Sequence, residues 1–343
     1  MKFAVTGSTG LLGNNLVRLL LRQGHQVRVG VRPSSAKEPL HGLDVEIVTG
    51  QLDDPAFAQE LLQGTDGLFH AAALIWLGKT RQEESRRANV IGSEVLAREC
   101  LSQGKRMVYV SSVDALAAST RNQLADETTL EPAKGNSAYV TSKRMAEQAL
   151  LKMHGESGLD VVIVNPGLML GPWDWKPSSG QMILAVTDGF MPFAPGGEIS
   201  ACDVRNVAAG TIAAMKKGRA GERYILAGVN MPYMELWRKM AARAGRRGPL
   251  KKIRLPMAAV FGTVGDMITL VTRRETNVNS AGVAMGQLLN RYSSDKARQE
   301  LGYEIGSVDV ALDDAWQWLL DHEYTKHAKT WQIDRSSSGL STQ

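Results

Sequence analysis

Tyr139 and Lys143 lie four residues apart and carry side chains suited to acid/base chemistry. They follow a helix start signal that ends at Ser137, and residues four apart share one face of a helix. An unperturbed tyrosine has a pKa near ~10, too high for efficient proton transfer at neutral pH, and an adjacent ammonium lowers that pKa by stabilising the phenolate. The pair therefore predicts a general acid/base, Tyr139, with Lys143 as its electrostatic partner in reach of a cofactor ribose.

The same spacing occurs at Tyr292 and Lys296, so spacing alone does not identify a site. Position distinguishes the two pairs. Tyr139 follows the fifth predicted strand and is expected near the carboxyl edge of a parallel sheet, where doubly wound folds bind ligands. Tyr292 falls in the C-terminal region, and we expect it and Lys296 to be structural.

Ser112 follows a predicted strand over residues 106–110, next to Ser111. A hydroxyl at the end of that strand could hold the reacting oxygen of a substrate. Serine pairs after strands are often only turn residues. The presence of Tyr139 and Lys143 favours a catalytic Ser112.

A glycine-rich turn, Thr6-Gly7-Ser8-Thr9-Gly10-Leu11-Leu12-Gly13, directly follows the first predicted strand. Gly7 permits a tight exit from the strand, Gly10 lets backbone N–H groups approach a pyrophosphate, and Gly13 lets the next helix pack close to the sheet. Thr9, Leu11 and Leu12 complete the turn and open that helix. The sequence therefore predicts a dinucleotide-binding turn.

The end of the second predicted strand indicates which nicotinamide cofactor is bound. A carboxylate there would accept from the ribose 2′-hydroxyl and repel a 2′-phosphate. Val31 is followed instead by Arg32, Ser34 and Ser35, all of which can donate to a phosphate. NADP(H) is preferred and NAD(H) remains possible; the alternative is that Arg32 is merely a surface residue.

Apolar strand-like runs alternate with helical patterns through the first half of the chain, with strands expected over residues 3–5, 27–31, 45–48, 67–71, 106–110 and 161–165. This alternation is typical of an α/β fold, a Rossmann-type doubly wound parallel sheet. We expect residues 1–165 to bind NADP, with residues 203–227 returning to that domain. Residues 166–330 would form a smaller, interleaved C-terminal α/β substrate domain, and residues 335–343 a disordered tail.

Composition indicates an ordinary globular protein: 343 residues, 43% hydrophobic, net charge +5. The basic residues are scattered without interleaved aromatics, so no nucleic-acid partner is expected. Two cysteines without metal-ligand spacing predict no metal site and a reducing, cytoplasmic location, and the N-terminus has no room for a secretory signal.

The apolar run over residues 255–272 is too short for a transmembrane segment, which favours a buried or lid helix. Membrane-surface contact is the alternative, because residues 246–254 are basic.

Together these motifs resemble the extended short-chain dehydrogenases/reductases (the NAD-dependent epimerase/dehydratase family) over most of the chain to about residue 320. The resemblance is closest to the dihydroflavonol-4-reductase-like branch, which includes hopanoid-associated sugar epimerase-like proteins. Besides the glycine turn and the Tyr/Lys pair, it rests on matches at residues 70–72, 89–92, 111–112, 165–167, 171–172, 296–298 and 301–303.

The resemblance implies roles for individual residues. Tyr139 would be the general acid/base, Lys143 its partner and ribose anchor, and Ser112 the hydrogen-bond donor to the substrate oxygen. Cofactor contacts would also come from Ala71, Ala72, Pro166 and Leu168, with Gln51, followed by Leu52, standing where the family often has an adenine-binding Asp. Trp76, Trp173 and Trp175 would lie in loops over the nicotinamide, as substrate contacts or as plain core. A homodimer is also implied.

The chain departs from sugar-nucleotide members of the family, because Ile199 stands where they carry a pyrophosphate-binding Arg and no Tyr-Gly follows the serines. Plant flavonoid reductases have an Asn near the position of Ala117, so the sequence does not favour flavonoid specificity. We therefore expect an NADP(H)-dependent oxidoreductase reducing a ketone or aldehyde, or oxidising the alcohol, on a rather apolar small molecule. The alternatives are a nucleotide-sugar epimerase/dehydratase with tightly bound NAD(P) and a non-catalytic NADP-binding sensor.

Overall fold

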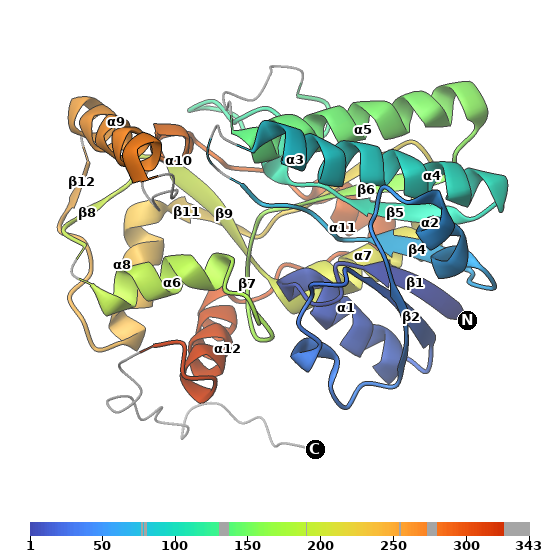
Figure 1. The fold of residues 1–343 in the computed structure, drawn as a ribbon. Coiled ribbons are helices and arrows are strands. Elements are labelled where there is room, and N and C mark those ends of the chain that lie inside the picture. The colour runs from blue at the N-terminus through green and yellow to red at the C-terminus, as the bar shows by residue number, and fades with distance from the viewer. Residues whose placement is uncertain are drawn as a thin grey trace.

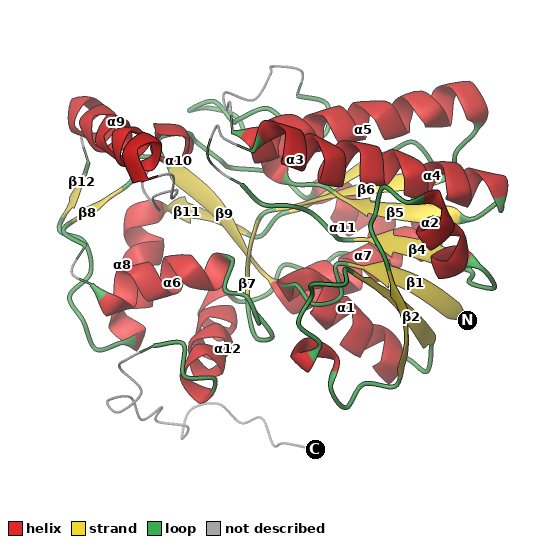
Figure 2. Cartoon of the chain, viewed as in Figure 1, coloured by secondary structure: helices red, strands yellow, loops and turns green. Residues whose placement is uncertain are grey.

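A parallel sheet of seven strands lies at the centre of the fold (Figures 1 and 2). The computed structural model describes residues 1–76, 78, 81–129, 137–189, 191–253, 255–272 and 280–325. The strands are β1 (Lys2–Thr6), β2 (Gln26–Val31), β3 (Val45–Thr49), β4 (Gly67–His70), β5 (Arg106–Val110), β6 (Val161–Pro166) and β10 (Arg223–Leu226). Their order is β10-β6-β5-β4-β1-β2-β3, and every neighbouring pair is parallel. The Rossmann-type sheet predicted from the sequence is confirmed.

Helices cover both faces of this sheet, because its strands are apolar on both sides. Phe3 and Val5 face a core shared with α1 (Leu11–Arg22), α7 (Val204–Lys217) and α11 (Asp295–Leu301). Ala4 faces a second core formed with α2 (Pro55–Leu62), α4 (Gly92–Ser102) and α5 (Ala138–Ser157). The short α3 (Gln82–Arg86) and a π-helical turn, η2 (Arg87–Ile91), lead into α4; single 3-10 turns, η1 (Glu38–Leu40) and η3 (Val113–Ala115), lie in loops.

A second region lies beside the carboxyl edge of the sheet (Figure 1). Its three-stranded sheet contains β7 (Leu168–Leu170), β9 (Glu198–Asp203) and β11 (Val229–Pro232). The helices α6 (Ser179–Asp188), α8 (Tyr233–Arg243) and α12 (Val308–Asp321) share an apolar core with this sheet. Between β9 and β11 the chain returns to the central sheet as α7 and β10.

The helices α9 (Leu255–Thr272) and α10 (Ser280–Met285) pack together at the outer end of this second region, next to the pair β8 (Phe193–Ala194) and β12 (Lys251–Lys252) (Figure 1). The expectation of a buried or lid helix over residues 255–272 is met on one side only: Ala258 is buried, whereas Val260 and Met267 are 62% and 61% exposed, so the helix is not fully buried, and its role as a lid stays a prediction. Within the described part of the chain, no helix is long and apolar enough to cross a membrane. Cys100 and Cys202 are both buried free thiols, and residues 335–343 lie outside the described residues.

Candidate functional site

The candidate cofactor residues lie on loops that leave the same edge of the central sheet. All seven strands are parallel, so their carboxyl ends meet there. The order of the strands reverses between β1 and β4: β1, β2 and β3 follow one another toward one side of the sheet, and β4, β5 and β6 toward the other. Doubly wound folds bind their ligands at such a switch point. The segments that leave this edge begin at Gly7, Arg32, Gly50, Ala71 and Ser111.

The glycine turn is built so tightly that it excludes side chains at two positions. Gly7 has a φ of +73°, and a Cβ on it would lie 2.6 Å from the carbonyl carbon of Ala71 and from the backbone nitrogen of Ala72. A Cβ on Gly13 would lie 2.0 Å from the carbonyl oxygen of Gly7. The helix α1 starts at Leu11 with Gly10 at its N-cap and no side-chain cap, so its first N–H groups are available to an anion.

The residues after β2 and β3 are exposed beside this turn. The side chain of Arg32 is exposed and makes no ion pair within the described residues. The backbone carbonyl of Arg32 accepts a hydrogen bond from the backbone N–H of Ser35 at 2.9 Å. Gln51 is exposed, whereas Leu52 is half-buried against Gly92 of α4. Both loops can therefore receive a ligand at this edge.

The loop after β4 is fixed by two buried polar side chains. His70 is fully buried; its ring nitrogens lie 2.6 Å from Thr6 Oγ1 and 2.9 Å from Ser93 Oγ, and burial lowers its pKa to about 3, so it is neutral. Asn89 accepts from the backbone N–H of Leu74 at 2.7 Å and donates to the Leu74 carbonyl and to Ser142. These bonds hold the loop that contains Ala71 and Ala72 against α5.

Ser112 and Tyr139 come together with a third residue, Asp114. Ser112 is buried, and its hydroxyl donates to Asp114 Oδ2 at 3.2 Å. Burial raises the pKa of the Tyr139 phenol well above its ordinary value, the carboxylate of Asp114 raises it further, and a hydrogen bond with Ser112 opposes the rise. Burial likewise raises the pKa of Asp114, again opposed by its bond to Ser112. Apart from its place two residues after Ser112, Asp114 has no feature in the sequence that predicts a role in the site.

We expected Lys143 to lower the pKa of Tyr139, but the groups that shift this pKa are Asp114 and Ser112, together with burial. The Lys143 ammonium donates to the Val110 carbonyl at 2.6 Å and to the Tyr109 hydroxyl at 3.3 Å, and Tyr139 is not among its partners. Burial lowers the pKa of Lys143 to about 7, and Glu147 opposes this shift. The expectation failed because it considered the helix face alone, whereas the end of β5 lies just beneath it.

Glu147, one turn after Lys143, anchors a buried polar network that positions Ser112. Its carboxylate pairs with Arg223 of β10 at 2.7 Å and accepts from the side-chain amide of Asn165 at 2.7 Å. The same amide donates to the backbone carbonyl of Ser112 at 3.0 Å. The i, i+4 spacing from Lys143 was the one sequence signal for Glu147.

The three tryptophans predicted near the substrate separate into two groups. The Trp76 carbonyl accepts from the backbone N–H of Tyr139 at 3.1 Å, which places Trp76 beside the start of α5. Trp173 and Trp175 pack instead against Trp318 of α12, with ring centroids 4.5 and 4.9 Å away. Both are partly buried against the apolar core around α12, which favours the second of the two alternatives; a substrate contact stays a prediction.

The remaining predicted residues fall on two further elements. Pro166 ends β6 and Leu168 begins β7, where the Leu168 carbonyl accepts from the thiol of Cys202 at 3.4 Å. Pro172, farther along this segment, accepts from the side chain of Asn15 in α1, so the segment lies against the first helix. Lys296 is bound to Glu222 and to the Arg223 carbonyl.

A sequence profile described as the NAD dependent epimerase/dehydratase family matches residues 3–227. The chain belongs to the NAD-dependent epimerase/dehydratase family. The match covers the central sheet and the turn, loop and helix that carry the candidate residues.

Individual relatives match nearly the whole chain. A Synechocystis protein named "Putative dihydroflavonol 4-reductase" is 38% identical over 94% of this chain and 96% of its own length. "Sterol demethylase protein B" of Methylococcus capsulatus is 31% identical over 93% of this chain and 98% of its own. The crystal structure of gox2253 superposes with a TM-score of 0.83 at 35% identity, covering 94% of this chain and 99% of that one. Within its family the chain is an oxidoreductase enzyme.

Proposed function

We propose that the protein is an NADP(H)-dependent oxidoreductase that interconverts a ketone or aldehyde and its alcohol on an apolar small molecule. The observation that supports the proposal is that the Tyr139 phenol interacts with the Ser112 hydroxyl and its backbone N–H donates to the Trp76 carbonyl in the loop after β4, with Lys143 one helical turn away. A phenol can transfer a proton to a carbonyl oxygen, and a neighbouring hydroxyl can hold that oxygen by a hydrogen bond.

The residues present fit the cofactor. The turn at Gly7 and Gly13 has no room for a Cβ, and the α1 N-terminus offers N–H groups to a pyrophosphate. Arg32 and Ser35 would donate to a 2′-phosphate, which favours NADP(H) over NAD(H). The full set proposed to hold the cofactor is Gly7, Thr9, Gly10, Leu11, Leu12, Gly13, Arg32, Ser35, Gln51, Leu52, Ala71, Ala72, Tyr139, Lys143, Pro166 and Leu168.

In the proposed reduction Ser112 donates its hydrogen bond to the substrate carbonyl oxygen in place of Asp114, and Tyr139 delivers a proton to that oxygen. When bound, NADPH supplies hydride to the carbonyl carbon. Because proton and hydride reach the substrate together, no full negative charge accumulates on the oxygen. Lys143 binds the cofactor ribose, and Tyr139 accepts the proton in the reverse, oxidative direction.

Two features favour an apolar substrate over a nucleotide sugar. Ile199, at the position of the expected pyrophosphate-binding Arg, is buried in the apolar core around β9. The nearby Arg205 is bound by Asp203 and Asp314, which leaves its guanidinium committed within the protein. The sterol-related name of one relative points to the same class of substrate.

We propose the two binding regions expected from the sequence: residues 1–165, with residues 203–227, bind the cofactor, and residues 166–330 bind the substrate. The expected homodimer and cytoplasmic location are part of the proposal.

The test is a panel of ketones, aldehydes, sterol-like ketones and nucleotide sugars, each incubated with NADPH or NADH while absorbance and product identity are followed. We expect net NADPH consumption with apolar carbonyl compounds and slower turnover with NADH. Conversion of a nucleotide sugar without net cofactor use would replace the proposal with an epimerase. Cofactor binding with no turnover of any compound would favour a sensor.

A further inference from the structure

One face of α9 is both apolar and exposed. The 18 residues of α9 include a single charged residue, Asp266. Ala258, Gly262 and Gly265 are buried, and a Cβ on Gly262 would lie 2.8 Å from Cα of Ser280 in α10, so this side faces the protein. The opposite side is exposed at spacings of three and four residues, at Pro256, Met257, Ala259, Val260, Thr263 and Met267. Contiguous apolar surface of this kind marks an interaction site.

The chain leading into α9 is strongly basic. Eight Arg or Lys residues and no acidic residue lie between Glu235 and Asp266. Lys239 and Arg243 are neutralised by Asp309. Among the described residues, no acidic side chain pairs with the exposed cations at Arg238, Arg247, Lys251 and Lys252.

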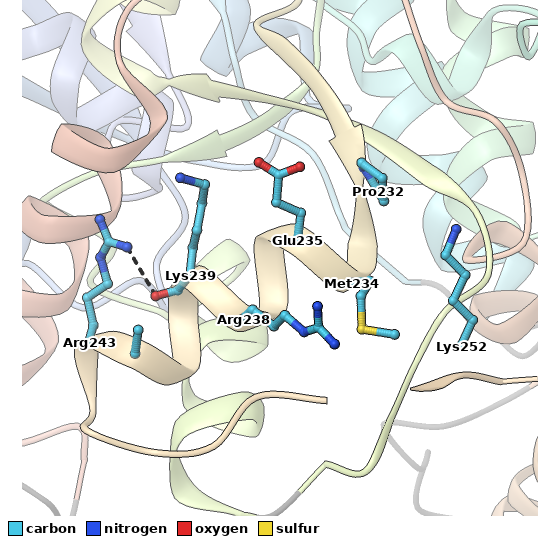
Figure 3. Close-up of a pocket in the computed structure, with 8 residues that line it drawn as sticks. Pro232, Met234, Glu235, Arg238, Lys239, Arg243 and Lys252 are labelled. Carbon is cyan, nitrogen blue, oxygen red and sulfur yellow. Dashed lines mark hydrogen bonds between the residues drawn. The ribbon is translucent and has the colours of Figure 1, made fainter. Parts of the chain in front are cut away.

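A hollow of about 530 Å³ lies beside these cations. Figure 3 shows its lining side chains along α8, with Pro232 contributed from the end of β11 and Lys252 from β12. Four of the lining residues are basic, and Glu235 is the one acidic residue among them. Lys239 and Arg243 are paired with Asp309, so the positive charge that the hollow offers comes from Arg238 and from Lys252, which lies in the strand just before α9.

We propose that this surface docks the protein on a lipid bilayer that contains anionic lipids. The exposed face of α9 inserts at the boundary between headgroups and acyl chains, and Arg247, Lys251 and Lys252 contact lipid phosphates. A second copy of the chain fits this surface less well, because a two-fold interface brings the same patch against itself and would oppose the two basic stretches. A nucleic acid would leave the apolar face exposed.

The segment that follows α10 contacts the candidate catalytic loop. After α10, the backbone carbonyls of Leu289 and Arg291 accept from the N–H groups of Ser119 and Ala125, each at 3.1 Å. Ser119 and Ala125 lie on the loop that leaves Ser112. The helix α10, which packs against α9, is thus followed by a segment that contacts this loop; the proposal does not depend on the reaction catalysed there.

The test is co-sedimentation of the full-length protein with vesicles of phosphatidylcholine alone or with 30% phosphatidylglycerol, a composition chosen to supply negative charge. We expect binding to the anionic vesicles that weakens in 0.5 M salt, and little binding to the neutral ones. The double variant Val260→Asp/Met267→Asp should lose most of the binding. Lys251→Ala/Lys252→Ala should weaken it about 30-fold and flatten its salt dependence.

Val310→Asp is the matched control, because Val310 is an exposed apolar residue of α12, outside this surface. It should bind vesicles like the wild type, and circular dichroism should show all variants folded. Absence of wild-type binding, or equal binding by the Val260→Asp/Met267→Asp and Val310→Asp variants, would overturn the proposal. So would a concentration-dependent dimer that Val260→Asp/Met267→Asp abolishes while vesicle binding persists.

Discussion

The hydroxyl of Ser112 donates a hydrogen bond to the carboxylate of Asp114, with 3.2 Å between Ser112 Oγ and Asp114 Oδ2. The same carboxylate raises the pKa of the Tyr139 phenol, whereas the Ser112 bond lowers it. Ser112 and Asp114 thus shift the pKa of the candidate acid/base in opposite directions.

Replacing Asp114 by Asn should shift the pH dependence of alcohol oxidation toward lower pH. The oxidative direction needs the Tyr139 phenolate, and loss of a nearby negative charge favours that ionised form. The measurement is kcat/KM for oxidation from pH 6 to 10. Asp44→Asn, in an exposed loop before β3, serves as the control and should leave the profile in place. A profile that moves to higher pH in Asp114→Asn would contradict this assignment.

Lys143 should make the stability of the cofactor-free protein depend on pH. Its pKa falls from 10.5 to about 7 on folding, so between these pH values the unfolded chain binds a proton that the folded protein does not. The free energy of unfolding therefore rises with pH in this range, by up to about 1.4 kcal/mol per pH unit. Urea unfolding at pH 7, 8 and 9 should show a shallower rise for Lys143→Met than for the wild type. Parallel curves would show that Lys143 is not titrating there.

Replacing Arg32 by Ala should weaken NADPH binding about 10- to 100-fold and leave NADH binding nearly unchanged. A charge-assisted hydrogen bond to a phosphate contributes about 1.5–3 kcal/mol, and NADH lacks the 2′-phosphate. Fluorescence titration of each cofactor measures the effect. Arg22→Ala, at the far end of α1, should bind both cofactors normally. An equal loss for NADPH and NADH would assign Arg32 to another part of the cofactor.

Replacing Glu147 by Gln should lower the free energy of unfolding by about 3 kcal/mol, because it leaves the partly buried Arg223 without its anion. Glu94→Gln removes an exposed pair with Arg98 and should cost about 0.5 kcal/mol or less. Urea unfolding of both variants gives the comparison. A similar small loss in both would show that the buried network contributes little to stability.

The central sheet could be predicted because each strand is a short apolar run bounded by turn residues, as at Phe3–Val5 before Gly7. The partners of Lys143 could not, because Tyr109 and Val110 reach it from a strand more than thirty residues earlier. Which side of α9 is exposed could not be predicted for a related reason. A run of apolar residues indicates burial, and only the packing against α10 decides which side of the helix is covered.

The most direct test of the account is turnover of an apolar ketone by Tyr139→Phe, measured as NADPH consumption beside NADPH affinity. The substitution removes the proton donor and keeps the ring, so we expect kcat to fall about 100- to 10,000-fold with cofactor affinity within a few-fold of wild type. Tyr303→Phe is the control, since the buried Tyr303 hydroxyl has no hydrogen-bond partner in the described structure, and it should turn over normally. Tyr139→Phe turning over at the wild-type rate would contradict the assignment of Tyr139 as the general acid/base.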